Sequence, residues 1–274
     1  MNPLKRNNVA IRGNPAAPGT IVFGHGFGCD QNMWRFVAPA FEDTHRVVLF
    51  DYVGCGHSDI AAYDAGRYAT LDGYALDVVE VLAAAGLADV VFVGHSVSAM
   101  IGALATLQAP GSIGRLVMLG PSPRYLNDPP DYFGGFEASD IDQLIEMIES
   151  NMLGWASYLA PVVMGHTARP ELQEELRASF CAIDPGITRR FARATFLADN
   201  RADLPKVRVP ALVVQMSDDA IAPAAIGQYV CRQLPRGTLA TIQGVGHCPH
   251  MTHPRETIEL IRGFLHGSEL AVAA

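Results

Sequence analysis

The chain has 274 residues, of which 49% are hydrophobic and 18% are charged, a composition typical of a globular protein. This length can bury a sizeable core, so we expect one large domain or a domain with a lid. The formal net charge is −8 and no basic cluster is present, which argues against partners such as nucleic acid or an anionic membrane surface.

The N-terminal segment and the cysteines indicate a cytoplasmic protein. Residues 1–15 lack the apolar core of a signal peptide, and no apolar run approaches the length of a transmembrane helix. The five cysteines are scattered and lack C-x-x-C spacing, which predicts reduced thiols and neither a disulfide framework nor a zinc site. We expect no metal, no cofactor and, by default, a monomer.

The first part of the chain alternates between strands and helices. Strands are expected at Val9–Arg12, Thr20–Phe23 and Arg46–Phe50, and a helix at Asp30–Phe41, where apolar residues have helical spacing. In the glycine-rich loop that follows, Asp51 is expected to accept backbone hydrogen bonds rather than to perform chemistry.

The next elements continue this alternation. An apolar stripe predicts a helix over Leu71–Ala85, and strands are expected at Val90–Val93 and Arg115–Leu119, with an apolar helix beginning near Ala99 between them. Strands and helices that alternate in this way predict a parallel, doubly wound sheet with helices on both faces.

The pattern changes between about Pro121 and Asp203, where helical segments dominate. The expected helices are Ser139–Leu153, Trp155–Val163, Pro170–Cys181 and Pro185–Ala198. Because this segment is rich in large aromatic side chains that the sheet does not need, we predict a helical cap, residues 123–203, inserted into a core of residues 1–122 and 204–274. The cap would enclose an apolar, water-excluding pocket. Packing of each aromatic side chain within the cap itself is the alternative.

The chain then returns to the alternating pattern. Strands are expected at Pro210–Met216 and Thr238–Ile242, and helices at Pro223–Leu234 and Pro254–Phe264. The tail from Ser268 is expected to be frayed.

The segment around Ser96 carries the chemistry. A buried strand leads into Gly94-His95-Ser96-Val97-Ser98 and then into an apolar helix, which is the context of a nucleophile elbow. The general motif is G-x-S-x-G, and Ser98 replaces its last glycine with another small residue. We therefore predict Ser96 as the nucleophile of a serine hydrolase.

A serine nucleophile needs a base, and the base needs a carboxylate to orient it. Ser96, Asp219 and His247 occur in the chain order of doubly wound hydrolases, each after an expected strand. Asp218 is the competing carboxylate. For the oxyanion hole, we expect the N–H groups of Phe27 and Val97, although the loop around Phe27 read alone could be a simple turn.

The remaining histidines and cysteines have simpler interpretations. His25 and His95 are expected to pack or hydrogen-bond locally. Loop positions are expected for His57, His250 and His253, and surface positions for His45, His166 and His266. Cys248 lacks an elbow, so we interpret it as a small apolar residue rather than a nucleophile. A serine at the elbow also weighs against dehalogenases and epoxide hydrolases, which use an aspartate there.

Several motifs together resemble the RsbQ group of α/β-hydrolases. RsbQ is a bacterial regulator of the general stress sigma factor, and the plant strigolactone and karrikin receptors belong to the same group. The residues that carry the resemblance are Gly24–Gln31, Leu49–Gly54, Gly94–Ala99, Tyr125–Asp128 and Gly246–His250. The resemblance extends from about Val9 to Leu265. One departure is Met216, where relatives often have serine.

The resemblance implies an α/β-hydrolase fold with an inserted four-helix cap, the Ser96–Asp219–His247 triad and an oxyanion hole from Phe27 and Val97. It also implies that Phe27, Phe136, Trp155 and Phe196 line a hydrophobic substrate pocket.

Two functions follow as expectations. The first is hydrolysis of a small hydrophobic ester or butenolide-type lactone through an acyl-enzyme. The second is a small-ligand receptor that regulates stress signalling through a protein phosphatase partner, which the resemblance alone suggests. Hydrolysis of a carbon–carbon bond or acyl transfer is a third alternative.

Overall fold

A seven-stranded sheet forms the centre of the molecule in the computed structural model, which describes residues 1–165 and 168–267. Its strand order is β1-β3-β2-β4-β5-β6-β7, and all neighbours are parallel except β1, which runs antiparallel to β3. The strands are β1 (Ala10–Gly13), β2 (Thr20–Gly24), β3 (Arg46–Leu49), β4 (Val90–His95), β5 (Ile113–Leu119), β6 (Ala211–Asp218) and β7 (Gly237–Val245).

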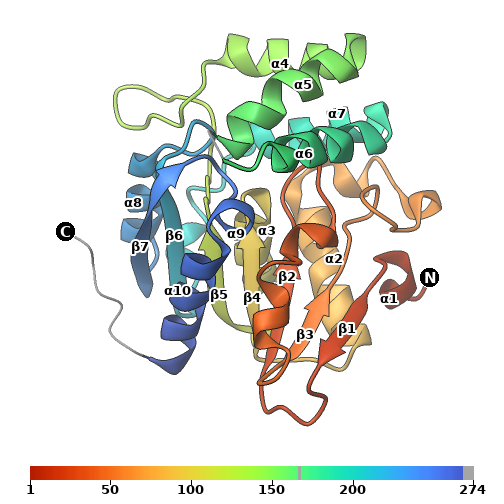
Figure 1. The fold of residues 1–274 in the computed structure, drawn as a ribbon, viewed down its shortest axis with the longest axis vertical. Coiled ribbons are helices and arrows are strands. Elements are labelled where there is room, and N and C mark those ends of the chain that lie inside the picture. Colours follow the sequence, from red (N-terminus) through yellow and green to blue (C-terminus); the bar gives the residue numbers. More distant parts are fainter. Residues whose placement is uncertain (166–167, 268–274) are drawn as a thin grey trace.

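Helices cover both faces of this sheet and its upper edge (Figure 1). The α-helices are α1 (Pro3–Arg6), α2 (Leu71–Ala84), α3 (Val97–Gln108), α4 (Ala138–Ser150), α5 (Met152–Met164), α6 (Pro170–Ala182), α7 (Pro185–Phe196), α8 (Ala224–Gln233), α9 (Pro249–Thr252) and α10 (Pro254–His266). The 3₁₀ turns are η1 (Gln31–Trp34), η2 (Ala38–Phe41), η3 (Ile60–Ala62), η4 (Arg67–Ala69) and η5 (Leu204–Lys206). Within the described residues, no helix is both long and apolar enough to cross a membrane.

The alternation of side chains along each strand divides the core into two layers. On β4, Phe92 belongs to the layer that contains residues of α2, α3 and α8, whereas its neighbour Val93 faces the layer with η1, η2 and α10. Both side chains are fully buried. Since a parallel sheet is covered on both faces, its strands are continuously apolar, as the sequence of β4 shows.

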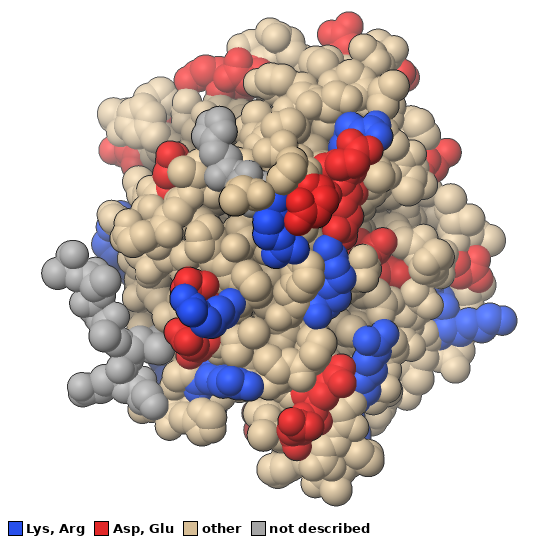
Figure 2. Space-filling view, viewed as in Figure 1, with Lys and Arg blue, Asp and Glu red and all other residues tan. Residues whose placement is uncertain are grey.

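Helices α4–α7 lie above the sheet (Figure 1) and pack into a third apolar cluster, which includes Trp155 and Phe180. Three contacts fasten them to the rest of the chain. Arg35 forms an ion pair of 2.5 Å with Glu175 on α6, the Ser179 hydroxyl donates to the Gly28 carbonyl at 2.8 Å, and the His247 N–H donates to the Val163 carbonyl at 2.7 Å. Figure 2 shows acidic and basic side chains interspersed on this face of the molecule.

One expected helix is wrong and another ends too late. In place of a single helix over Asp30–Phe41, the chain forms η1 and η2, because Asp30 caps a short 3₁₀ turn and Pro39 lacks the N–H that a continuous helix requires. The expected helix Ser139–Leu153 is also too long. It ends at Ser150, and Asn151 begins α5 by accepting a hydrogen bond from the Gly154 N–H.

A buried ion network joins the N-terminus to α2. The Asp77 carboxylate is fully buried and pairs with Arg6 at 3.0 Å and with Arg67 at 2.5 Å. Asn7 and Tyr68 donate further hydrogen bonds to it. Because each lone pair has a donor, the buried charge is compensated.

Candidate active site

Ser96 lies on a sharp turn between β4 and α3. Its φ of 55° and ψ of −121° are unusual for a residue with a side chain, and this strained backbone is typical of a nucleophile elbow. The turn brings the first turn of α3 against the strand. A Cβ atom on Gly94 would lie 2.4 Å from the Ser98 carbonyl oxygen, so only glycine fits there.

Ser98 explains the departure from the G-x-S-x-G motif. Its buried hydroxyl donates to the His25 carbonyl and lies 2.8 Å from the Tyr52 hydroxyl. The Tyr52 N–H in turn donates to His25 Nε2 at 3.1 Å. This serine therefore ties the elbow helix to the loop after β2, which a glycine could not do.

The structure brings Ser96, His247 and Asp219 together. The Ser96 Oγ lies 2.8 Å from His247 Nε2, and His247 Nδ1 lies 2.7 Å from Asp219 Oδ2. All three residues are buried. Since the carboxylate can only accept, His247 donates from Nδ1, and its Nε2 is left to accept from the serine hydroxyl.

The neighbouring carboxylates at the end of β6, Asp218 and Asp219, differ in their environments. Asp219 is buried, and its second oxygen accepts from the N–H groups of Ile221 at 2.8 Å and Ala222 at 3.0 Å. Asp218 is exposed. The geometry therefore favours Asp219 over the competing Asp218 as the partner of His247.

Both backbone groups of His247 are held. Its N–H donates to the Val163 carbonyl at the end of α5, and its carbonyl lies 2.9 Å from His95 Nε2. The preceding Gly246 has a φ of 111°, and a Cβ there would lie 2.5 Å from the Met164 carbonyl. The loop that carries His247 is thus enclosed between α5 and the elbow.

An apolar pocket of about 30 Å³ adjoins Ser96 and His247. The residues that line it are Phe27, Cys29, His95, Ser96, Tyr125, Leu159, Val163, Leu176, Phe180, Thr195, Phe196, Ile221, His247 and Cys248. Of the four expected pocket residues, Phe27 and Phe196 are among them. Trp155 lies behind this wall, fully buried against Phe27 and Phe180, and Phe136 packs on Tyr125 at a ring distance of 6.4 Å.

The N–H groups expected for the oxyanion hole belong to suitably placed residues. Val97 is the first residue of α3, where an N–H has no acceptor within the helix. Phe27 lines the pocket together with Ser96.

Tyr125 is a pocket residue whose role sequence reasoning missed. Its hydroxyl lies 3.4 Å from Ser96 Oγ, and burial raises its pKa far above the usual range, so it stays protonated. The sequence held one signal for this position: Tyr125 follows a parallel strand, β5. The carboxyl ends of parallel strands meet at one edge of the sheet, where Ser96 also lies.

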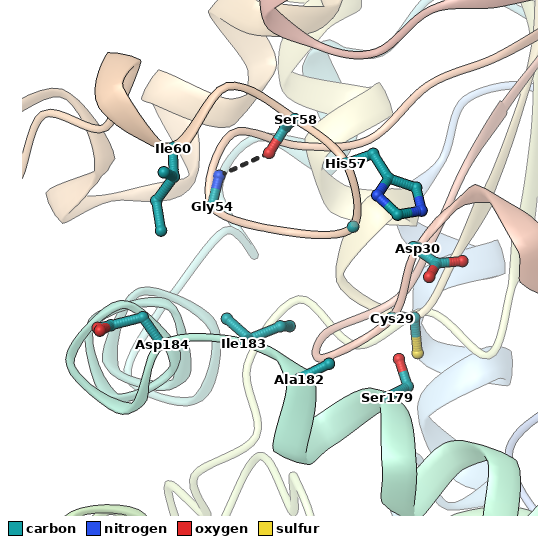
Figure 3. Close-up of a pocket in the computed structure, with 11 residues that line it drawn as sticks. Cys29, Asp30, Gly54, His57, Ser58, Ile60, Ser179, Ala182, Ile183 and Asp184 are labelled. Carbon is teal, nitrogen blue, oxygen red and sulfur yellow. Dashed lines mark hydrogen bonds between the residues drawn. The ribbon is translucent and has the colours of Figure 1, made fainter.

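A second cavity of about 170 Å³ lies beside this pocket (Figure 3). It opens between the loops after β2 and β3 and the connection from α6 to α7, and Cys29 lines both cavities. Its polar groups already have structural partners: Asp30 and Asp184 cap η1 and α7, and Ser58 donates to the Cys55 carbonyl. We assign no ligand to it.

The remaining histidines and cysteines that the structure describes are not part of the Ser96–His247–Asp219 chain. His250 is an exception to its expected loop position, because it belongs to α9 and is fully buried between Trp34 and His95. His166 lies outside the described residues. Burial raises the pKa of the Cys248 thiol, which keeps it protonated and unsuited to nucleophilic attack.

Comparisons with known proteins agree with this fold. A family model described as alpha/beta hydrolase fold matches residues 19–254. A karrikin insensitive 2 receptor of Petunia hybrida is 36% identical over 95% of this chain and 96% of its own length. A strigolactone esterase of Arabidopsis thaliana is 35% identical over 95% of this chain and 97% of its own. The solved structure of a hydrolase from Oleispira antarctica is 43% identical, covers 97% of both chains and superposes with a TM-score of 0.94. The chain therefore belongs to the alpha/beta hydrolase fold family.

Proposed function

We propose that this protein is a serine hydrolase that cleaves a small hydrophobic ester or a butenolide-type lactone through an acyl-enzyme. The observation that carries the proposal is the hydrogen-bonded chain from Ser96 through His247 to Asp219 beside an apolar pocket. The similarity to proteins named esterases supports the bond type. We assign residues 123–203 to a cap and residues 1–122 and 204–274 to the catalytic core.

The reaction begins when His247 Nε2 accepts the Ser96 proton and Ser96 Oγ attacks the substrate carbonyl carbon. The carbonyl oxygen becomes an oxyanion, which the N–H groups of Phe27 and Val97 stabilise. His247 then gives its proton to the leaving oxygen as the tetrahedral intermediate collapses. Asp219 keeps His247 in the required tautomer and stabilises its charged form.

Water completes the cycle. His247 removes a proton from a water molecule, which attacks the acyl carbonyl. As the second tetrahedral intermediate collapses, His247 returns this proton to Ser96 Oγ, so the acid and free Ser96 are released. The protonated Tyr125 hydroxyl, close to Ser96 Oγ, is placed to donate a hydrogen bond to the ester or leaving oxygen.

The pocket limits the substrate. The aromatic walls from Phe27, Phe180 and Phe196 favour a small apolar acyl group over a bulky or charged one. A small unsaturated lactone meets these requirements, and its leaving oxygen stays attached to the acyl group after ring opening.

A time course with a fluorogenic butenolide, followed by fluorescence and by intact protein mass, tests the proposal. We expect product release and a mass increase on the wild-type protein, with both lost in Ser96→Ala. Unchanged ester turnover in Ser96→Ala would refute the assignment of the nucleophile.

The similarity to a karrikin insensitive 2 receptor favours a second candidate function, in which the same site senses a small hydrophobic ligand and regulates a protein partner. The resemblance to the RsbQ group alone suggests that this partner is a protein phosphatase. The same time course separates the two. A single-equivalent burst with a persistent adduct supports the receptor, and sustained turnover with a transient adduct supports the metabolic hydrolase.

A further inference from the structure

His95 precedes the nucleophile in the chain, and its imidazole contacts the main chain of His247. The residue is only 2% exposed, and its Nε2 lies 2.9 Å from the His247 carbonyl oxygen. Because that oxygen can only accept, Nε2 carries the proton and donates. The bond joins residues that are 152 positions apart in the chain.

The surroundings of His95 keep it neutral and in this tautomer. Its Nδ1 has no hydrogen-bond partner among the described residues and lies against Gly26, where a Cβ atom would approach it to 2.5 Å. Burial, and then the nearby His250 and His247, lower its pKa well below the usual value. His250 and His247 face its ring at 4.3 and 5.0 Å, and His25 also lies close enough to act on its charge.

We propose that His95 is a positioning residue for catalysis: its Nε2–H fixes the main chain of His247 and thereby holds the His247 imidazole between Ser96 and Asp219. This inference rests on the proposed serine hydrolase function, because it gives His95 a role in that reaction.

The reason that this anchor matters is geometric. The His247 imidazole must hold hydrogen bonds of 2.7 Å to Asp219 and 2.8 Å to Ser96 at the same time. Its loop contains Gly246, and glycine restricts the backbone little. The only other main-chain bond of His247 described here is the one to Val163. Without His95, the buried His247 carbonyl would lose its donor and the loop could shift. A displacement of about 1 Å in a catalytic group can lower the rate by roughly a hundredfold.

The test compares His95→Ala with His250→Ala as a matched control. Both substitutions remove a buried imidazole from the same cluster, but the His250 nitrogens have no hydrogen-bond partner among the described residues to lose. We expect kcat for ester hydrolysis to fall about tenfold to a hundredfold in His95→Ala with little change in KM, and to remain close to the wild-type value in His250→Ala.

Two further variants separate positioning from general damage. His95→Gln keeps an N–H donor and should recover part of the lost kcat. In a His247→Ala background, His95→Ala should cause no additional loss, because its effect passes through His247. If His95→Ala does not fold, His95→Leu fills the space without supplying a donor and takes its place.

A spectroscopic readout keeps this test independent of turnover. The proton between His247 Nδ1 and Asp219 gives a downfield proton resonance, which should shift or broaden in His95→Ala but not in His250→Ala. Equal kcat values and unchanged resonances in the two variants would overturn the inference. If the wild-type protein has no Ser96-dependent turnover, the proposed function fails, and the resonance alone then decides whether His95 anchors His247.

Discussion

Replacement of Asp219 by asparagine tests which carboxylate orients His247, since the sequence alone offers both Asp218 and Asp219. Asp219 Oδ1 accepts two main-chain N–H bonds, so the carbonyl oxygen of an asparagine would keep that position. Its NH₂ group would then face His247 Nδ1 and oblige that atom to accept. His247 would carry its proton on Nε2 and could not accept the Ser96 proton.

The expected loss follows from this reversal of the tautomer. A serine hydrolase with the wrong histidine tautomer loses roughly 10⁴-fold in kcat, which corresponds to about 5 kcal/mol of barrier. Asp218→Asn is the matched control, since that side chain is exposed, and it should retain wild-type kcat.

Steady-state hydrolysis of a p-nitrophenyl ester measures both variants, and thermal melting verifies that each is folded. If folded Asp219→Asn keeps more than about a tenth of wild-type kcat, Asp219 does not set the tautomer of His247 in the way described. The same conclusion follows if Asp218→Asn loses as much activity as Asp219→Asn.

Two further predictions concern stability. Burial lowers the pKa of His250 from 6.5 to about 3. Below about pH 6.5 the unfolded chain therefore binds a proton that the folded chain does not, and the stability decreases as the pH falls toward 3. The melting temperature should therefore drop less between about pH 7 and about pH 5 in His250→Phe than in the wild type, and an equal drop would contradict this. Asp77→Ala leaves Arg6 and Arg67 without their buried partner and should cost about 3–5 kcal/mol. That cost lowers the melting temperature by roughly 6–20 °C with kcat unchanged, whereas unchanged melting would show that the network contributes little.

The parts of this protein that sequence could predict are those that local patterns determine. The elbow is encoded within a few residues, because a buried strand, a glycine (Gly94) that lets α3 approach the strand, and small residues after Ser96 occur together in the sequence. The order of strands and helices follows from hydrophobic periodicity in the same way. These features need no knowledge of distant contacts.

The remaining features depend on packing between distant segments. Whether Asp218 or Asp219 meets His247 depends on how the chain leaves β6, since neighbouring residues point in opposite directions. Trp155 and Phe136 lie outside the pocket wall because of how α4–α7 dock on the core, which no local pattern records. The apolar spacing over Asp30–Phe41 is helical, but Pro39 and the Asp30 cap divide this segment into two 3₁₀ turns.

The hydrogen bond from the His247 N–H to the Val163 carbonyl means that α4–α7 are not a detachable module. Removing them would deprive the buried main-chain N–H of His247 of its acceptor, and the equivalent helices of a relative would replace that acceptor only with a carbonyl at the same position. Any variant of this fold with new substrate preferences must therefore keep the end of α5 in register with His247 while the rest of the helical layer changes.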